Sequence, residues 1–313
     1  MAESVRDIKR RIKSVKNIAQ ITKAMEAVSA NKMRKSQMVA LSARPYAVTA
    51  LEMLDNLISR TPVLPDFFAE RPIKKSLILV VTSDKGLAGA YNSNVLRSAE
   101  KLADKMKKAG QSFAVVTVGR KAKEYFSRRG AEVVKSFSGF SDLSALKETN
   151  PVADFVTAWF MRKSYDEAFA VYTNFKTTLR QEVSVRRILP VTKDGIAEMV
   201  LGILPEHGRY APKAQGSIEK AIQSRYSFQY VFEPDPANIL NALVPKLLSM
   251  HIHHIILEAN ASEHSSRMVA MKNASDNAKD LIAGLSLKYN KLRQAGITRE
   301  LIEITAGREA LNN

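Results

Sequence analysis

The chain has 313 residues, enough for two domains at about 150 residues each. Lys and Arg number 48 against 31 for Asp and Glu, so the formal net charge is +17 and an acidic partner is expected. Cysteine is absent, which excludes a disulfide framework, a thiolate zinc site and a cysteine nucleophile. No apolar run approaches about 18 residues and the N-terminus lacks a signal-peptide pattern, so we expect a helix-rich globular protein without a membrane span.

A long N-terminal helix is predicted first. Between residues 3 and 58 there is no Gly, and the only Pro is Pro45, where we expect a bend. A helix of that length extends roughly 84 Å at about 1.5 Å per residue, so it needs a partner along its length. Its apolar residues recur at spacings of three and four, which predicts a heptad seam that shifts once: Val5, Ile8, Ile12 and Val15, then Ile18, Ile21, Met25 and Val28.

A second long helix is predicted at the other end of the chain. After the breakers at 233–236, helix formers continue from Ala237 to about Thr305, with Pro245 as a kink or a second start. A four-three alternation recurs there, at Ala274, Ala278, Leu281, Leu285, Lys288, Leu292 and Ala295, with Tyr289 beside the charged position. One such helix at each end of the chain predicts an antiparallel intramolecular coiled coil.

The middle of the chain predicts an α/β domain. Residues 76–82 are a continuous apolar run, followed by a glycine turn, a helix over 93–108 and a second run at 113–118, which is typical of a parallel βαβ unit. Further elements are expected as helices at 121–129 and 152–165, strands at 132–135, 168–175, 182–189 and 228–232, and a loop at 193–226.

The predicted fold class is therefore α/β plus long helices. We expect an N-terminal shaft helix over 1–60 and a C-terminal shaft helix over 237–313 that pairs with it. Between them, residues 73–232 are expected to form a Rossmann-like α/β domain with an antiparallel edge.

Two places were considered for catalysis or cofactor binding. The turn at Gly86–Gly89 lacks the dinucleotide-binding and P-loop patterns, so ordinary turn chemistry is favoured over a nucleotide site. A histidine cluster comprises His251, His253, His254 and His264, with Glu258. Its spacing does not match a zinc-protease motif, so packing and hydrogen bonding between helices is favoured over a metal site. We expect no catalytic residue, cofactor or metal.

The basic excess is concentrated at the N-terminus, where the first 50 residues carry eleven basic side chains against three acidic ones. A helix face of one sign fits two kinds of partner, the phosphates of a nucleic acid or the acidic surface of a protein. The methionines of the long helices leave a similar choice between seam packing and a soft contact with a partner. They are Met25, Met33, Met38, Met53, Met268 and Met271.

Three separated segments resemble the gamma subunit of F-type ATP synthases. DIKRRIKSVKN at 7–17, continued at 21–25 and 28–35, resembles the N-terminal helix of that family. TSDKGLAGAYN at 82–92 is similar to its central loop. ASEHSSRMVAM at 261–271 and YNKLRQAGITRELIEI at 289–304 resemble its C-terminal helix, so the resemblance covers both ends and the middle of the chain.

The resemblance implies a rotary central-stalk subunit that is not itself catalytic. The paired helices would lie inside a hexamer of alpha and beta subunits, and the α/β domain would rest with the epsilon subunit on the ring of c subunits. Ion flow would turn the shaft and couple to ATP synthesis or hydrolysis, at the cytoplasmic face of a bacterial plasma membrane. The alternative is a basic coiled-coil protein that binds nucleic acid, and a third reading is an α/β enzyme with helical arms.

The resemblance also implies a set of residues that bind the alpha/beta hexamer. They are Met25, Lys85, Arg267, Arg293, Gln294, Thr298 and Glu300. Arg293 and Gln294 would engage a loop of the beta subunit, and Arg267 would help to fix the shaft.

Overall fold

The computed structural model describes residues 4–42, 57–58, 61, 64–142, 144–192, 233 and 235–311. The chain divides into two compact units, one formed by residues 1–29 and 268–313 and the other by residues 30–267. The two longest helices, α1 (Val5–Ser42) and α8 (Pro236–Leu311), each contribute to both units. The predicted fold class is confirmed, whereas the exact limits of the three predicted segments stay a prediction.

A five-stranded sheet forms the centre of the unit of residues 30–267, with strand order β3-β2-β1-β4-β5. The strands are β1 (Lys75–Val81), β2 (Ser112–Val118), β3 (Val133–Phe137), β4 (Glu167–Phe175) and β5 (Gln181–Leu189). The first four run parallel and β5 pairs antiparallel with β4, as the sequence predicted.

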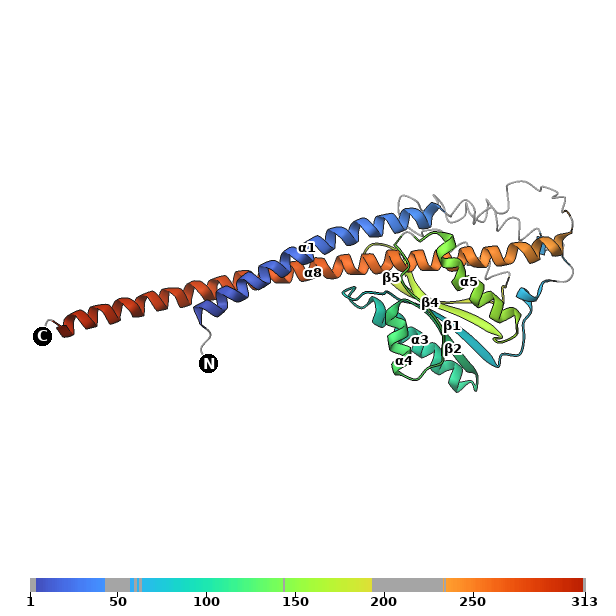
Figure 1. Cartoon of the computed structure of the whole chain (residues 1–313), viewed down its shortest axis with the longest axis horizontal. Helices are drawn as coiled ribbons and strands as arrows, with labels where there is room; N and C mark the ends of the chain where they lie inside the picture. The colour runs from blue at the N-terminus through green and yellow to red at the C-terminus, as the bar shows by residue number, and fades with distance from the viewer. Residues whose placement is uncertain are drawn as a thin grey trace. The chain divides into compact units, whose positions relative to one another are not determined.

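Helices cover both faces of this sheet, which explains why the central strands are apolar without a break. On one face, Ile78, Val80 and Val171 pack against α3 (Tyr91–Lys108) and α4 (Arg120–Arg128). On the other face, alternate residues such as Leu79 and Tyr172 share a core with α5 (Leu146–Met161) and the first part of α8. Figure 1 shows the sheet with α3 and α4 together on one side.

Two predicted helices differ from the structure, and four further predicted features fall outside the described residues. Helix α5 begins at Leu146 and contains Pro151, whereas the sequence placed its start after that proline. Helix α8 runs through Pro245 as one helix. The bend at Pro45, Met53, the loop at 193–226 and the strand at 228–232 lie outside the described residues.

The apolar part of α8 is long enough to span a membrane by length and composition alone. Within Pro236–Arg308, an 18-residue window has a mean hydropathy of 1.2, and 44% of that window is buried inside the protein. The sequence predicts no such segment, because no uninterrupted apolar run approaches about 18 residues. Leu240, Val244, Leu248 and Ile252 of α8 are buried in the core shared with the sheet, and this packing accounts for much of the apolar character.

In the unit of residues 1–29 and 268–313, α1 and α8 pair as the predicted coiled coil (Figure 1). Ile8 and Val15 of α1 are buried against Ala278 and Leu285 of α8. The other apolar residues of this cluster are Ile12, Ala19, Ile282, Tyr289 and Leu292.

The predicted positions of the seam are partly wrong. On α1 the heptad does not shift after Val15; it continues through Ala19, Thr22 and Ser29, while Ile18, Ile21 and Val28 are 50%, 60% and 55% exposed. On α8 the residues Ile282 and Tyr289 occupy positions that the sequence assigned to Leu281 and Lys288, and Ala295 is exposed. Small and hydroxyl-bearing residues fill the α1 side of this seam, so the large apolar side chains of α1 lie at neighbouring exposed positions.

Candidate functional site

A group of polar contacts surrounds the loop of residues 82–90, which follows β1 at the carboxyl edge of the sheet. Asp84 joins three strand ends there, since its carboxylate accepts hydrogen bonds from the amides of Arg120, after β2, and Gly139, after β3, at 2.9 and 2.8 Å. Thr82 acts similarly, because its hydroxyl donates to the Val118 carbonyl and accepts from the Ala122 amide. The base of the loop is therefore rigid.

The tip of the loop is exposed and held in an unusual backbone conformation. Leu87 has φ of +62°, although it is not glycine, and it is 65% exposed. Lys85 beside it is exposed, and the Ser83 hydroxyl donates to the Lys85 carbonyl at 2.5 Å. Ser83 also bonds with Asn92 at the start of α3. A strained backbone with an exposed apolar side chain is a feature of binding sites.

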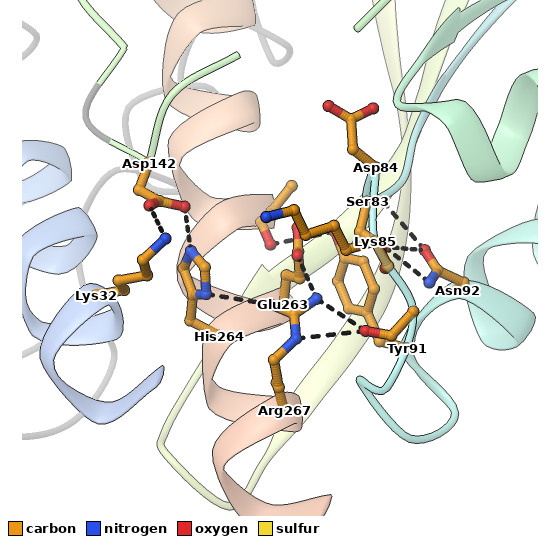
Figure 2. Close-up of polar contacts among 12 residues, drawn as sticks. Lys32, Ser83, Asp84, Lys85, Tyr91, Asn92, Asp142, Glu263, His264 and Arg267 are labelled. Carbon is orange, nitrogen blue, oxygen red and sulfur yellow. Dashed lines mark hydrogen bonds and ion pairs between the residues drawn. The ribbon is translucent and has the colours of Figure 1, made fainter. Parts of the chain in front are cut away.

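Side chains and a backbone carbonyl of helix α8 also hold the loop and the start of α3 (Figure 2). The Arg267 guanidinium donates to the Gly86 carbonyl through Nε at 3.4 Å and through Nη2 at 3.2 Å, and Nη2 also donates to Glu263 at 2.6 Å. Tyr91 donates its hydroxyl to the Ala259 carbonyl at 3.1 Å. Burial, followed by the nearby Glu263 carboxylate, raises the pKa of Tyr91 well above its usual range, so the phenol stays a donor.

A second group of contacts extends from Arg267 to α1. The imidazole of His264 lies 3.3 Å from Arg267 through Nδ1 and 2.5 Å from Asp142 through Nε2. Lys32 of α1 forms an ion pair with the second oxygen of Asp142 at 2.6 Å. Partial burial acts to raise the pKa of Asp142, but the bonds from Lys32 and His264 outweigh it and the net shift is downward.

The residues that the resemblance assigned to partner binding divide between the two units. Among residues 30–267, Lys85 and Arg267 come together, because Arg267 bonds to the carbonyl of the residue after Lys85. In the other unit, Met25 is half-buried, and Arg293, Gln294, Thr298 and Glu300 are exposed. Thr298 donates its hydroxyl to the Gln294 carbonyl at 3.0 Å.

Sequence reasoning missed Lys32, Asp142, Tyr91 and Glu263. No motif marks Asp142, because its role depends on a contact with α8 across 122 positions of the chain. Only the position of Glu263 four residues before Arg267 gave a local signal, since side chains at that spacing meet on a helix.

The histidines of this cluster make packing and hydrogen-bond contacts between elements. Among the described residues, no group of three or more His, Cys, Asp or Glu side chains is arranged to hold a metal ion. His253 bonds to Thr149 of α5 at 2.9 Å, which is the predicted hydrogen bond between helices. His251 and His254 are instead buried with Glu258, which bonds to Tyr172 of β4.

Comparisons with known proteins agree over the whole length. The family model described as ATP synthase matches residues 4–311. The ATP synthase gamma chain of Opitutus terrae is 40% identical over 308 residues, which cover 98% of each chain. The gamma chains of Picosynechococcus sp. and Moorella thermoacetica are 37% and 35% identical, over 98% of this chain and 99% of each relative.

Solved structures share the fold. A chain from the mitochondrial ATP synthase of Euglena gracilis, in its OSCP/F1/c-ring structure, matches with a TM-score of 0.65 at 18% identity, over 98% of this chain and 94% of that one. A chain from the central stalk and c-ring structure of Tetrahymena thermophila matches with a TM-score of 0.57 at 23% identity, over 82% and 99% of the two chains.

An α/β domain carried on paired terminal helices, together with these matches, defines the class of protein as an ATP synthase subunit. Within that class the chain belongs to the gamma chain family. None of the relatives reported above is a nucleic-acid-binding protein, and the alternative based on the +17 charge has no support from them.

Proposed function

We propose that this chain is the rotating central-stalk subunit of an F-type ATP synthase and that it is not itself catalytic. The full-length similarity to gamma chains carries the proposal. In this role the chain transmits rotation between transmembrane ion flow and the alpha/beta hexamer, where ATP is made or hydrolysed.

The outer surface of α1 supports a contact with the hexamer. Ile18, Ile21 and Val28 lie outside the coiled-coil seam and are at least half exposed. Their spacings of three and seven residues put them along one side of the helix. An exposed apolar stripe of this kind is typical of a protein interface, and half-buried Met25 lies within it.

Two further surfaces fit the same role. The end of α8 exposes Ile297, Leu301 and Ile304, at 49%, 58% and 68%, on the segment that carries Arg293, Gln294, Thr298 and Glu300. We propose that this segment contacts the hexamer. In the other unit, exposed Lys85 is presented on a rigid loop, and a fixed cation of this kind fits an acidic surface on the beta subunit.

The remaining partners follow from the family. The solved relatives are described as parts of a rotor, a central stalk and a c-ring assembly. We propose that this chain likewise joins the epsilon subunit and the ring of c subunits. It would then be a peripheral protein at the cytoplasmic face of a bacterial plasma membrane, with no cofactor of its own.

Purification of the tagged chain from its own membranes tests the proposal. Recovery of stoichiometric alpha, beta and epsilon subunits with ATPase activity is the expected result. Recovery of the chain alone, or with nucleic acid in a salt-dependent complex, would contradict the proposal.

A further inference from the structure

The contacts around His264 determine which of its ring nitrogens carries the proton. A guanidinium has only N–H donors, so Nδ1 of His264, 3.3 Å from Nη1 of Arg267, must act as the acceptor. The proton therefore lies on Nε2, which donates to the Asp142 carboxylate at 2.5 Å. On these two contacts we assign His264 the neutral Nε2–H tautomer.

This tautomer completes the fixation of Arg267. Arg267, which is only 7% exposed, then donates through its guanidinium to three different acceptors: His264, Glu263 and the Gly86 carbonyl. A planar group held by acceptors in several directions cannot rotate away from the loop. If the proton moved to Nδ1, two N–H groups would face each other and Arg267 would lose one of these bonds.

Asp142 selects the tautomer because a carboxylate only accepts hydrogen bonds. One of its oxygens accepts a hydrogen bond from Nε2–H of His264, and the other forms an ion pair with the Lys32 ammonium. The segment that carries Asp142 is also fixed through its backbone, since Ser36 of α1 donates to the Asp142 carbonyl at 3.0 Å. A continuous chain of polar contacts thus runs from α1 through Asp142, His264 and Arg267 to Gly86 (Figure 2).

We propose that His264 is a positioning residue that holds Arg267 on the Gly86 carbonyl and so fixes the loop carrying Lys85 and Leu87 to α8. A force applied to the loop tip by a partner then passes into the long helix instead of bending the loop. This inference rests on the proposed function for the identity of the partner. The tautomer and the rigidity of the loop do not depend on it.

Asp142→Asn tests the selection of the tautomer. With its amide oxygen facing Lys32, the new side chain presents an N–H₂ group to His264, which must then accept through Nε2 and carry its proton on Nδ1. Losing a hydrogen bond to a charged group at Arg267 should shift the ratio of held to released loop about tenfold. Nitrogen NMR of the histidine rings, of which the chain has five, should report the change of tautomer directly.

His264→Asn is the matched control. Its amide oxygen takes the position of Nδ1 and still accepts from Arg267, while the contact with Asp142 is lost. The loop should therefore stay held in His264→Asn, and also in the double variant with Asp142→Asn, which has no imidazole to change tautomer. A spin label at Leu87→Cys measures the mobility of the loop, and the absence of native cysteine leaves no other site to label.

The expected result is a mobile label in Asp142→Asn and an immobile label in the wild type, His264→Asn and the double variant. Thermal melts of the four full-length chains show whether each is folded. Equal label mobility in all four, or a double variant as mobile as Asp142→Asn, would overturn the inference.

The same variants are then assembled with alpha, beta, epsilon and membrane subunits. We expect Asp142→Asn to hydrolyse ATP within about twofold of the wild type but to pump fewer ions per ATP, by about threefold or more, with pumping retained in His264→Asn. Normal pumping by Asp142→Asn despite a mobile loop would show that the loop transmits no force between the partner and α8. That result would overturn the functional part of the inference. If the wild-type chain failed to assemble or pump, the proposed function would fail, while the label and NMR results would still decide how the loop is held.

Discussion

Gly119 occupies a position that no other residue can take without displacing the backbone. It connects β2 to α4 with φ of +92°, and a Cβ added there would lie 2.2 Å from the Thr82 carbonyl oxygen. Thr82 is itself fixed, because its amide and hydroxyl both donate to the Val118 carbonyl. The neighbour therefore has no freedom to move aside.

Gly119→Ala should destabilise the unit of residues 30–267 by about 3 kcal/mol or more, from backbone strain and overlap together. Gly110→Ala is the control, since Gly110 has φ of +74° but nothing within 4 Å of an added Cβ. It should cost only the strain of the left-handed backbone, about 1 kcal/mol. Urea unfolding followed by circular dichroism measures both, and equal losses would show that the contact with Thr82 relaxes.

His251 makes the stability of this unit dependent on pH. Burial, followed by the nearby Arg186 and His254 side chains, lowers the pKa of His251 from 6.5 to about 3. Because the folded pKa lies below the unfolded one, the unfolded chain binds more protons between these values. The contribution to stability is complete above about pH 6.5 and decreases as the pH falls toward 3.

His251→Leu should therefore reduce the pH dependence of unfolding. Between pH 7.5 and 5 the wild type is expected to lose about 2 kcal/mol more than the variant. Denaturant unfolding at the two pH values gives the comparison, and all other titrating groups cancel in the difference. Parallel losses in the two proteins would mean that His251 is accessible to protons in the folded state.

At the residue scale, the sequence indicated the loop and Arg267 but not Asp142, which fixes His264 beside them. Lys85 could be identified from the sequence because the motif around it is contiguous. Asp142 could not, because its partners Lys32 and His264 lie 110 and 122 positions away along the chain. Hydrogen bonds across such separations depend on the packing of whole elements, which no local pattern records.

At the scale of elements, position in the coiled coil decides whether a leucine of α8 is buried in the seam or exposed. Leu285 is 7% exposed in the coiled coil, whereas Leu281, one helical turn before it, is 45% exposed. The sequence assigned both to the seam. The repeat of three and four was correct, but Leu281 could not be distinguished from the adjacent seam residue Ile282, because both side chains are large and apolar.

Leu285→Ala should cost about 2 to 3 kcal/mol through the lost contacts and the cavity, and Leu281→Ala less than about 1 kcal/mol. Thermal unfolding of the full chain, followed by the loss of helical circular dichroism, distinguishes them. Equal losses of stability in the two variants would restore the seam that the sequence predicted, which contains both residues.

The hydroxyl groups in the α1 seam have a local explanation. Thr22 donates to the carbonyls of Ile18 and Ala19 in its own helix, at 3.0 and 3.1 Å, so its burial leaves no unpaired donor. Such a residue can occupy a buried position although its polarity predicts exposure. This is why the sequence placed a shift in the heptad where the structure has none.

At the scale of the whole molecule, residues that contribute little to folding should control assembly. The double variant Ile18→Gln/Ile21→Gln removes exposed apolar surface from α1, so the melting of the free chain should change by less than about 0.5 kcal/mol. Its affinity for the alpha/beta hexamer should fall by about tenfold or more.

Ile18→Leu/Ile21→Leu is the control for this pair, because it keeps an apolar surface of similar size. Pull-down of alpha and beta subunits at a series of concentrations measures the affinity of both variants. Unchanged binding by the glutamine pair would locate the interface on another face of the shaft.

The last turns of α8 are the part of the paired helices where α1 gives no support. Among the described residues, the apolar contacts of α8 with α1 extend as far as Leu292, and residues 293–308 are exposed along every side of the helix. A single helix bends and twists more easily than two wound together, because stiffness rises steeply with the width of the cross-section. If the hexamer grips this end while the other end turns, the end of α8 acts as a spring, storing elastic energy between steps and releasing it smoothly.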